Sequence, residues 1–243
     1  MKKTFYFMLF MSCFLFSQAQ EPVSIGVSDS ISSILQPVKA RKPLLTINAS
    51  GGYSHWFIDI PDAAKGYPFD EFYFKKLQNG FNVSIDVNFF VANFCALGVK
   101  YSLFKAKNEI NDVIFNFGSY TQKGDLIDQI FIHYIAPNIL FRVGKPTGKV
   151  FFVFDGSVGC LLYRNIGTAY YPMTEKGAAF GVQLIPGIEL KVAEGFFVNY
   201  RVGGTIGTMN TYSVTTRGQT ITINDDAVRL HRLDFSIGFR YKY

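Results

Sequence analysis

A two-residue alternation of apolar and polar side chains recurs eight times along this chain and constrains its fold more than any other feature. In the last such stretch, LDFSIGFRYKY, every second residue is apolar or aromatic, and Asp, Ser, Gly, Arg and Lys lie between. Successive side chains of a β-strand point to opposite faces, so each stretch predicts a strand with one apolar and one polar face. The eight stretches are residues 44–54, 81–89, 95–103, 130–143, 150–163, 180–191, 196–207 and 233–243.

The connections between these stretches alternate in length. The short ones are residues 90–94, 144–149 and 192–195, and the long ones are 54–77, 106–127, 164–177 and 208–227. Short connections with Gly, Pro and polar residues are typical of hairpin turns. The rhythm predicts an up-and-down meander of eight antiparallel strands. The alternation continues inside the last long connection, which predicts a β-hairpin extension with its turn at Arg217–Gly218.

The fourth stretch, residues 130–143, is irregular. Ile130, Ile132 and Tyr134 share one phase, whereas a second group, Ile139, Phe141 and Val143, shares the opposite phase. Proline inside a strand usually marks an irregular position. We therefore predict a bulge or bend at Ala136–Pro137 that brings both groups to one face.

Residues 1–19 have the features of a secretory signal peptide. Lys2 and Lys3 precede an apolar segment, residues 5–16, and Ser17-Gln18-Ala19 fits a small-x-small cleavage site. Cleavage there lowers the formal net charge from +6 to +4, because it removes Lys2 and Lys3. The remaining basic residues are scattered, so we predict no nucleic-acid site.

Residues 20–42 are rich in Ser, Pro and small residues and show no persistent period. They predict a flexible leader ahead of a single β domain at residues 43–243. Cleavage leaves Cys95 and Cys160, which fall on the apolar faces of non-neighbouring strands, so no disulfide is predicted.

Composition raises the question of which face of the strands meets water. Hydrophobic residues make up 49% of the chain and charged residues only 17%, whereas about 25% charged residues is usual in soluble domains. Yet no apolar stretch reaches the roughly 18 residues that a spanning helix needs. The apolar excess is carried by the alternating strands.

The polar face favours the interior of a barrel over a water-exposed surface. It is rich in Gly, Ser, Thr and Asn, and small residues suit a narrow interior. Its charges are balanced, as enclosed charges must be. They are Asp86, Lys100, Arg142, Asp155, Glu189, Arg201, Asp234 and Arg240. The apolar faces extend over about 9–11 residues, which is the length of a tilted strand that crosses a bilayer.

Aromatic residues gather near both ends of the strands, as in the girdles of membrane barrels. They are Phe89, Phe94, Phe141, Phe196, Tyr241 and Tyr243 at the short-turn end and Tyr53, Trp56, Tyr101 and Tyr163 toward the long loops. A soluble, lipocalin-like ligand-binding barrel with the faces reversed stays open as an alternative, because alternation alone does not exclude it.

With these features, residues 43–243 resemble the eight-stranded outer membrane β-barrel family that includes the OmpA transmembrane domain and OmpX. The resemblance implies an all-β, eight-stranded antiparallel up-and-down transmembrane β-barrel, with short periplasmic turns and long extracellular loops. It implies a monomer in the outer membrane of a Gram-negative bacterium, and the Phe-rich strands resemble Bacteroidetes members. It also implies that the last strand is the assembly signal read by the insertion machinery. The residues of that signal are Phe235, Ile237, Phe239, Tyr241 and Tyr243.

For function, the resemblance and the interior charges together predict a structural or surface-interaction protein and no open pore. We expect the charges to form a structural ion-pair network that fills the barrel. Aromatic residues of the first long loop are candidate contacts for a partner or for lipopolysaccharide. These candidates are Trp56, Phe57, Tyr67 and Phe69. Alternatives are a small-solute channel and a lipid-modifying barrel enzyme.

The histidines give little support to an enzyme or a metal site. His133 falls in the irregular stretch with a phase that points inward, but no recognisable motif surrounds it, His55 or His231. The three are far apart, and no short His/Cys/Asp spacing occurs. We therefore predict no catalytic residues, no metal and no cofactor.

Overall fold

The computed structural model describes residues 44–58, 68–116, 119–145, 148–169 and 171–243. The predicted signal peptide and leader, residues 1–42, lie outside the described residues. The elements, in chain order, are β1 (Leu44–Trp56), α2 (Pro68–Leu77), β2 (Asn79–Phe90), β3 (Cys95–Asn116), β4 (Thr121–Val143), β5 (Val150–Ala169), β6 (Tyr171–Ala193), β7 (Phe196–Thr216), β8 (Gln219–Arg229) and β9 (Arg232–Lys242).

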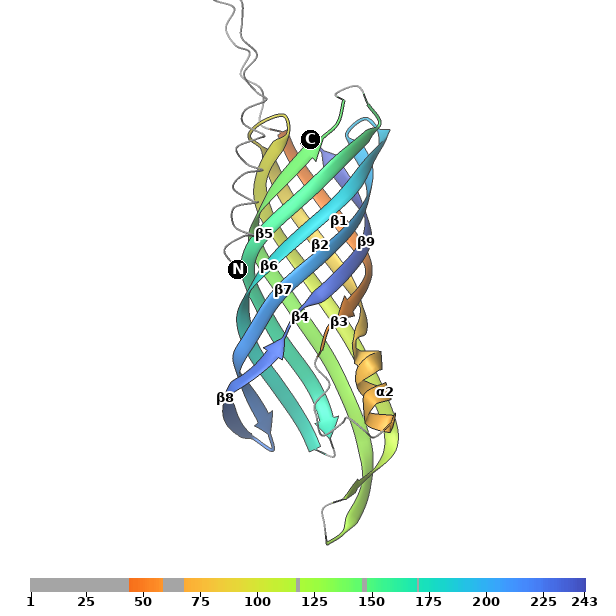
Figure 1. The fold of residues 1–243 in the computed structure, drawn as a ribbon, viewed down its shortest axis with the longest axis vertical. Helices are drawn as coiled ribbons and strands as arrows, with labels where there is room; N and C mark the ends of the chain where they lie inside the picture. Colours follow the sequence, from red (N-terminus) through yellow and green to blue (C-terminus); the bar gives the residue numbers. More distant parts are fainter. Residues whose placement is uncertain (1–43, 59–67, 117–118, 146–147, 170) are drawn as a thin grey trace, which may run out of the picture. The chain divides into compact units, whose positions relative to one another are not determined.

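Eight of these strands form a closed antiparallel ring. Each strand from β1 to β7 pairs with the next, β7 also pairs with β9, and β9 pairs with β1, which closes the ring (Figure 1). Closure leaves no open strand edge in the ring. The predicted eight-stranded up-and-down barrel with alternating short and long connections is confirmed.

The strands are steeply tilted. The register can be followed from Thr46 around the ring through one strand after another, and it returns to β1 at Trp56, ten residues further along. This stagger corresponds to a tilt of about 40° from the barrel axis. A row of paired residues therefore climbs toward the long loops as it passes from β1 to β9.

The predicted hairpin extension of the last long connection is also confirmed. β8 pairs with the outer part of β7, with Thr216 opposite Gln219. The turn between them is formed by Arg217 and Gly218, with φ angles of 49° and 76°. This left-handed backbone conformation is the one that a tight hairpin turn requires.

The predicted bulge at Ala136–Pro137 is wrong. β4 keeps one register with β3 through this point, where Ala136 lies opposite Lys100 and Pro137 opposite Val99. The pairing with β5 omits these two residues and resumes in the same register. The phase is kept, so Ile130, Ile132 and Tyr134 face the interior, whereas the second group, Ile139, Phe141 and Val143, faces outward. Two apolar surfaces, inside and outside, explain the change of phase.

The outer face of the ring is apolar, whereas charged side chains are buried inside. Phe239, Phe152 and Val99 are 68%, 64% and 60% exposed, whereas Asp86 and Lys100 are 0% exposed. We call this outward-facing surface the apolar belt. It comprises Ile47, Ile85, Leu97, Val99, Ile139, Phe152, Phe154, Val158, Val182, Leu184, Ile188, Tyr200, Val202, Ile206, Phe235, Ile237 and Phe239. A water-soluble barrel would bury these side chains and expose the charges.

α2 packs at the end of the barrel where the long connections lie. Pro68 begins the helix, and Lys75 and Lys76 lie in its last turn, near the negative end of its dipole. Tyr73 and Leu77, four residues apart on one helical face, are 2% and 1% exposed. Figure 1 shows α2 beside β3 and β4, the strands that extend farthest at this end. Among the described residues, no helix is long and apolar enough to cross a membrane.

Candidate functional site

The barrel interior holds most of the polar side chains that could carry a function, and its centre is an ion-pair network around Asp86. One Asp86 oxygen lies 3.2 Å from Arg201 Nη1 and the other 3.2 Å from Arg240 Nη2. Asn48 and Asn88 also donate hydrogen bonds to this carboxylate, at 2.7 and 2.6 Å. These groups come from β1, β2, β7 and β9, which are brought together only by ring closure.

The same network extends across the barrel to the other predicted charges. Lys100 Nζ lies 2.7 Å from Asp155. Glu189 lies 2.9 Å from Arg142 and 2.8 Å from Arg240, and Arg201 reaches Glu189 and Asp155 at 3.9 and 4.0 Å. Three carboxylates and four cations of the predicted set therefore form one connected group.

Asp234 is the eighth predicted charge, and it lies apart from this group. It pairs with Arg232 Nε at 3.1 Å and accepts a hydrogen bond from Ser54. Arg232 also donates to Ser102 Oγ at 2.8 Å. Sequence reasoning missed Arg232, because it precedes the last alternating stretch. Its even-numbered position, in phase with Asp234, was a signal that could have found it.

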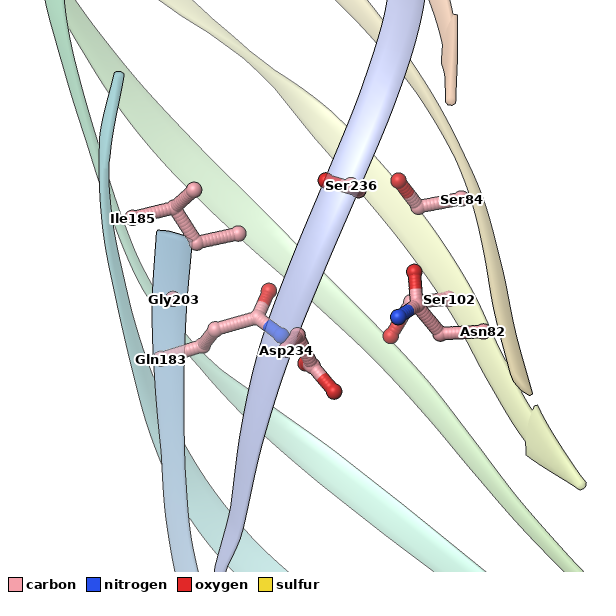
Figure 2. A pocket seen from close by; sticks show the side chains of 8 residues that line it. All are labelled: Asn82, Ser84, Ser102, Gln183, Ile185, Gly203, Asp234 and Ser236. Atoms are coloured by element: carbon pink, nitrogen blue, oxygen red, sulfur yellow. The ribbon is translucent and has the colours of Figure 1, made fainter. Parts of the chain in front are cut away.

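A small polar cavity lies next to Asp234 (Figure 2). It is lined by Asn82, Ser84, Ser102, Gln183, Ile185, Gly203, Asp234 and Ser236, and it has room for about one water molecule. Gln183 donates to Thr205 at 2.9 Å, but its Oε1 has no hydrogen-bond partner among the described residues. The cavity suits an ordered water and is too small for an organic solute.

The interior closes toward the short turns with aromatic and aliphatic side chains. The Arg142 guanidinium lies over the rings of Phe151 and Phe197, at 3.6 and 4.4 Å from their centroids. Leu140 and Val153 are buried on the same inner surface, at 0% and 4% exposure. These cation–π contacts stabilise the positive charge of Arg142 inside the barrel.

Toward the long loops the inner face carries a second apolar cluster of buried side chains, which we call the outer plug. It comprises Trp56, Tyr73, Leu77, Phe104, Ala106, Ile130, Ile132, Tyr134, Ala136, Leu161, Tyr163, Met209 and Leu230. Each of these side chains is at most 7% exposed. The inner face is therefore polar at mid-barrel and apolar at the outer end, which is why the phase changes along β4.

Trp56 belongs to this plug, so its predicted role as an exposed loop contact is wrong. It ends β1, is 0% exposed, and donates from Nε1 to the Arg229 carbonyl at 2.8 Å. Its ring packs against Phe104 and Tyr163. The even phase of β1 continues to Trp56 and turns it inward. Tyr163 is likewise buried and does not belong to an outer girdle.

The other loop candidates differ in what the structure describes. Phe57 is 49% exposed and packs edge-on against His55. Tyr67 lies outside the described residues, and Phe69 lies in α2. The residues of the predicted assembly signal all point outward on β9 and just after it. Phe235, Ile237, Phe239, Tyr241 and Tyr243 are 44%, 54%, 68%, 41% and 81% exposed.

A carboxylate cluster at the outer end, beyond the apolar belt, connects α2 to the barrel wall. Tyr73 donates to Asp128 at 2.7 Å, and Asn165 donates to the other Asp128 oxygen at 2.6 Å. Asn165 and Tyr163 also donate to Glu175, at 3.4 and 3.3 Å. Burial raises the pKa of Asp128 and the pKa of Glu175 above the usual carboxyl range. Sequence reasoning missed this cluster, because it depends on a loop helix.

His133 faces outward on β4, contrary to the predicted inward phase, because β4 has no bulge. Its Nδ1 lies 2.8 Å from the Tyr101 hydroxyl. Cys95 on β3 and Cys160 on β5 are free thiols on the outer face. Among the described residues, no three His, Cys, Asp or Glu side chains are placed to hold a metal ion.

No protein-family model and no curated protein sequence matches this chain. Several solved structures, by contrast, are similar to it. Neisserial surface protein A is 10% identical, covers 82% of this chain and 97% of its own, and superposes with a TM-score of 0.50. A major outer membrane protein from Thermus thermophilus is 10% identical, covers 83% of this chain and 99% of its own, with a TM-score of 0.53. The chain therefore has the fold of outer membrane β-barrels, as the sequence resemblance implied.

Proposed function

We propose that this chain is an outer membrane β-barrel protein with a closed interior, which acts through its outer surface in a structural or surface-interaction role. The observation that supports this most directly is the reversal of the two faces. The apolar belt is exposed, whereas the charges are enclosed and paired. Such an apolar outer face requires a lipid environment.

The rest of the chain is consistent with this location. Residues 1–19 serve as the cleaved signal peptide and residues 20–42 as a periplasmic leader. The short turns face the periplasm and the long connections face the cell exterior. The aromatic face of β9, from Phe235 to Tyr243, is read by the insertion machinery. We propose a monomer, in line with a closed ring that leaves none of its own strand edges open.

Three layers of side chains support a closed interior and disfavour the channel. The Arg142 stack lies at the short-turn end, the ion-pair network at mid-barrel and the outer plug at the other end. An eight-stranded barrel has an interior just wide enough for side chains to fill it. We accordingly assign no solute pathway. A non-enzymatic role is a separate part of the proposal.

The surface-interaction role is supported by apolar side chains on the extracellular parts. Phe57, Phe72, Ile114 and Ile221 are 49%, 57%, 63% and 60% exposed beyond the apolar belt. Exposed apolar groups on loops are typical of contact sites for another macromolecule or for lipopolysaccharide. Phe57, together with Tyr67 and Phe69 of the same connection, is the first such contact to test.

The proposal is tested by the mobility of the protein on an SDS gel with and without boiling, after fractionation of the cell envelope. A closed barrel keeps its hydrogen-bonded wall in detergent and changes mobility only on boiling. We expect a heat-dependent shift for protein from the outer membrane fraction. A protein found in the soluble periplasmic fraction, without a shift, would refute a membrane barrel and favour the soluble ligand-binding barrel.

Closure of the interior is tested separately in planar lipid bilayers. We expect the inserted, heat-shiftable protein to give no discrete conductance steps above those of protein-free bilayers. Reproducible steps from the same preparation would show an open path and favour the channel.

A further inference from the structure

Three basic side chains form a row on the outer surface of neighbouring strands. Lys105 on β3 is paired with Phe131 on β4, Phe131 with Arg164 on β5, and Arg164 with Lys176 on β6. Residues in one register row point to the same side of a sheet. We call Lys105, Arg164 and Lys176 the basic row.

The basic row lies where the apolar belt ends. On the three strands that carry the basic row, β3, β5 and β6, the outward-facing residues toward the short turns are apolar. Leu103 precedes Lys105, Leu162 is 43% exposed next to Arg164, and Phe180 is 80% exposed below Lys176. Because the strands tilt, the row climbs away from the belt from Lys105 to Lys176. The three charges therefore lie beyond the apolar belt at successively higher levels, toward the long loops.

These charges lack the partners that other charges of this barrel have. Among the described residues, no carboxylate forms an ion pair with any member of the row. By contrast, Lys107, one step outward on β3, pairs with Glu109 at 2.7 Å. Arg164 and Lys176 lie directly opposite each other, and like charges in that position are destabilising. The contact of Lys105 with the Phe131 ring, at 5.2 Å, does not neutralise its charge.

The unpaired charges and the apolar surface beneath them fit an amphipathic anion. Phosphate is bound by Lys as a point charge and by Arg through paired hydrogen bonds. Apolar side chains below the row would contact the acyl chains of the same molecule. We propose that the basic row binds the phosphorylated headgroup of an outer-leaflet lipid, with its acyl chains on the apolar belt. This inference rests on the proposed function, since it requires the belt to face lipid.

The test uses the full mature chain in uncharged dodecyl maltoside micelles and measures lipid binding by native mass spectrometry. The probes are diphosphorylated lipid A and the same lipid A without phosphates. The variant is Lys105→Gln/Arg164→Gln/Lys176→Gln. The matched control is Lys145→Gln/Lys149→Gln/Lys191→Gln, which removes the same charge from exposed positions at the short-turn end.

We expect the wild type and the control variant to prefer the diphosphorylated lipid by about tenfold in dissociation constant. The basic-row variant should lose that preference and still bind the dephosphorylated lipid as the wild type does. An unchanged preference in the basic-row variant would overturn the inference. The inference would also be overturned if inorganic phosphate, at the same concentration as the lipid, abolished lipid binding completely. The ligand of the basic row would then be a free anion.

The heat-dependent mobility shift separates this inference from the proposed function. A shift in all three proteins, with no preference for phosphorylated lipid, would refute the basic row alone. A wild type without a shift would refute the membrane barrel and the inference with it.

Discussion

Glu189 shows how a single residue connects charges from different strands at the barrel centre. Its carboxylate is 0% exposed and lies between Arg142 and Arg240, so two cations from different strands share it. Glu189→Gln removes the counter-charge of Arg142 and one of the two carboxylates at Arg240, which keeps Asp86. Breaking one partner of a buried ion pair typically costs about 3–5 kcal/mol. We expect a loss of that order in the free energy of unfolding, measured by urea titration in detergent micelles.

The matched control for this change is Glu194→Gln, which lies exposed in the short turn between β6 and β7. Its effect should stay within about 0.5 kcal/mol, as for most surface substitutions. Equal destabilisation by the two substitutions would show that the interior network contributes no more than a surface charge.

The interior charges also show which features of the candidate site could be predicted from the sequence and which could not. Seven of the eight charges that strand alternation placed inside form one network, because the phase of a strand fixes which face a side chain occupies. The ion-pair partners of these charges could not be predicted from the sequence, since pairing depends on the register between strands. Arg232 was missed because it precedes the last alternating stretch, and Asn165 because its cluster depends on the loop helix α2. Trp56 was misplaced because a long loop was assumed to begin before the strand had ended.

At the level of elements, α2 is attached to the barrel through groups that titrate. The raised pKa values of Asp128 and Glu175 mean that the docked outer end holds protons more tightly than free carboxyls do. This contribution to docking is full below the ordinary carboxyl pKa and is lost as the pH rises through the docked-state pKa. Protection of α2 amides from hydrogen exchange, corrected for the intrinsic rate, should fall over that interval.

The control for this pH dependence is Asp128→Asn/Glu175→Gln, which removes both titrations and keeps acceptors for Tyr73 and Tyr163. Its α2 protection should be nearly independent of pH in the same interval. A double variant with the pH dependence of the wild type would exclude these carboxyls as its origin.

The seam between β1 and β9 depends on a close approach of two backbones. A Cβ at Gly52 would collide with the Phe235 carbonyl oxygen, whereas a Cβ at Gly204 on β7 meets nothing within 4 Å. Gly52→Ala should therefore impair ring closure and deplete the heat-shiftable form on an SDS gel. Gly204→Ala should keep it. If Gly52→Ala gives as much of this form as Gly204→Ala, the seam is not tight.

Elements were predictable where periodicity alone determined them. The eight strands and the β7–β8 hairpin follow from the two-residue alternation. The absence of a bulge in β4 could not be predicted in this way. In a sequence, inward-facing Ile130 and Ile132 look the same as outward-facing apolar residues. α2 could not be predicted from strand alternation, since its burial depends on a plug assembled from several strands.

For the whole molecule, the central claim is that the barrel has lipid outside and a filled interior. Trp56 makes this testable, because it is the single tryptophan of the chain and is 0% exposed inside the outer plug. Val99 lies on the apolar belt and is 60% exposed. A tryptophan at Val99 would contact acyl chains, whereas native Trp56 would not.

We would first measure quenching of tryptophan fluorescence by brominated phosphatidylcholine, in bilayers that contain the wild type or Trp56→Phe/Val99→Trp. Strong quenching of the double variant and weak quenching of the wild type is the expected result. Both proteins should show the heat-dependent shift. Strong quenching of native Trp56 with little quenching at position 99 would contradict the assignment of the two faces.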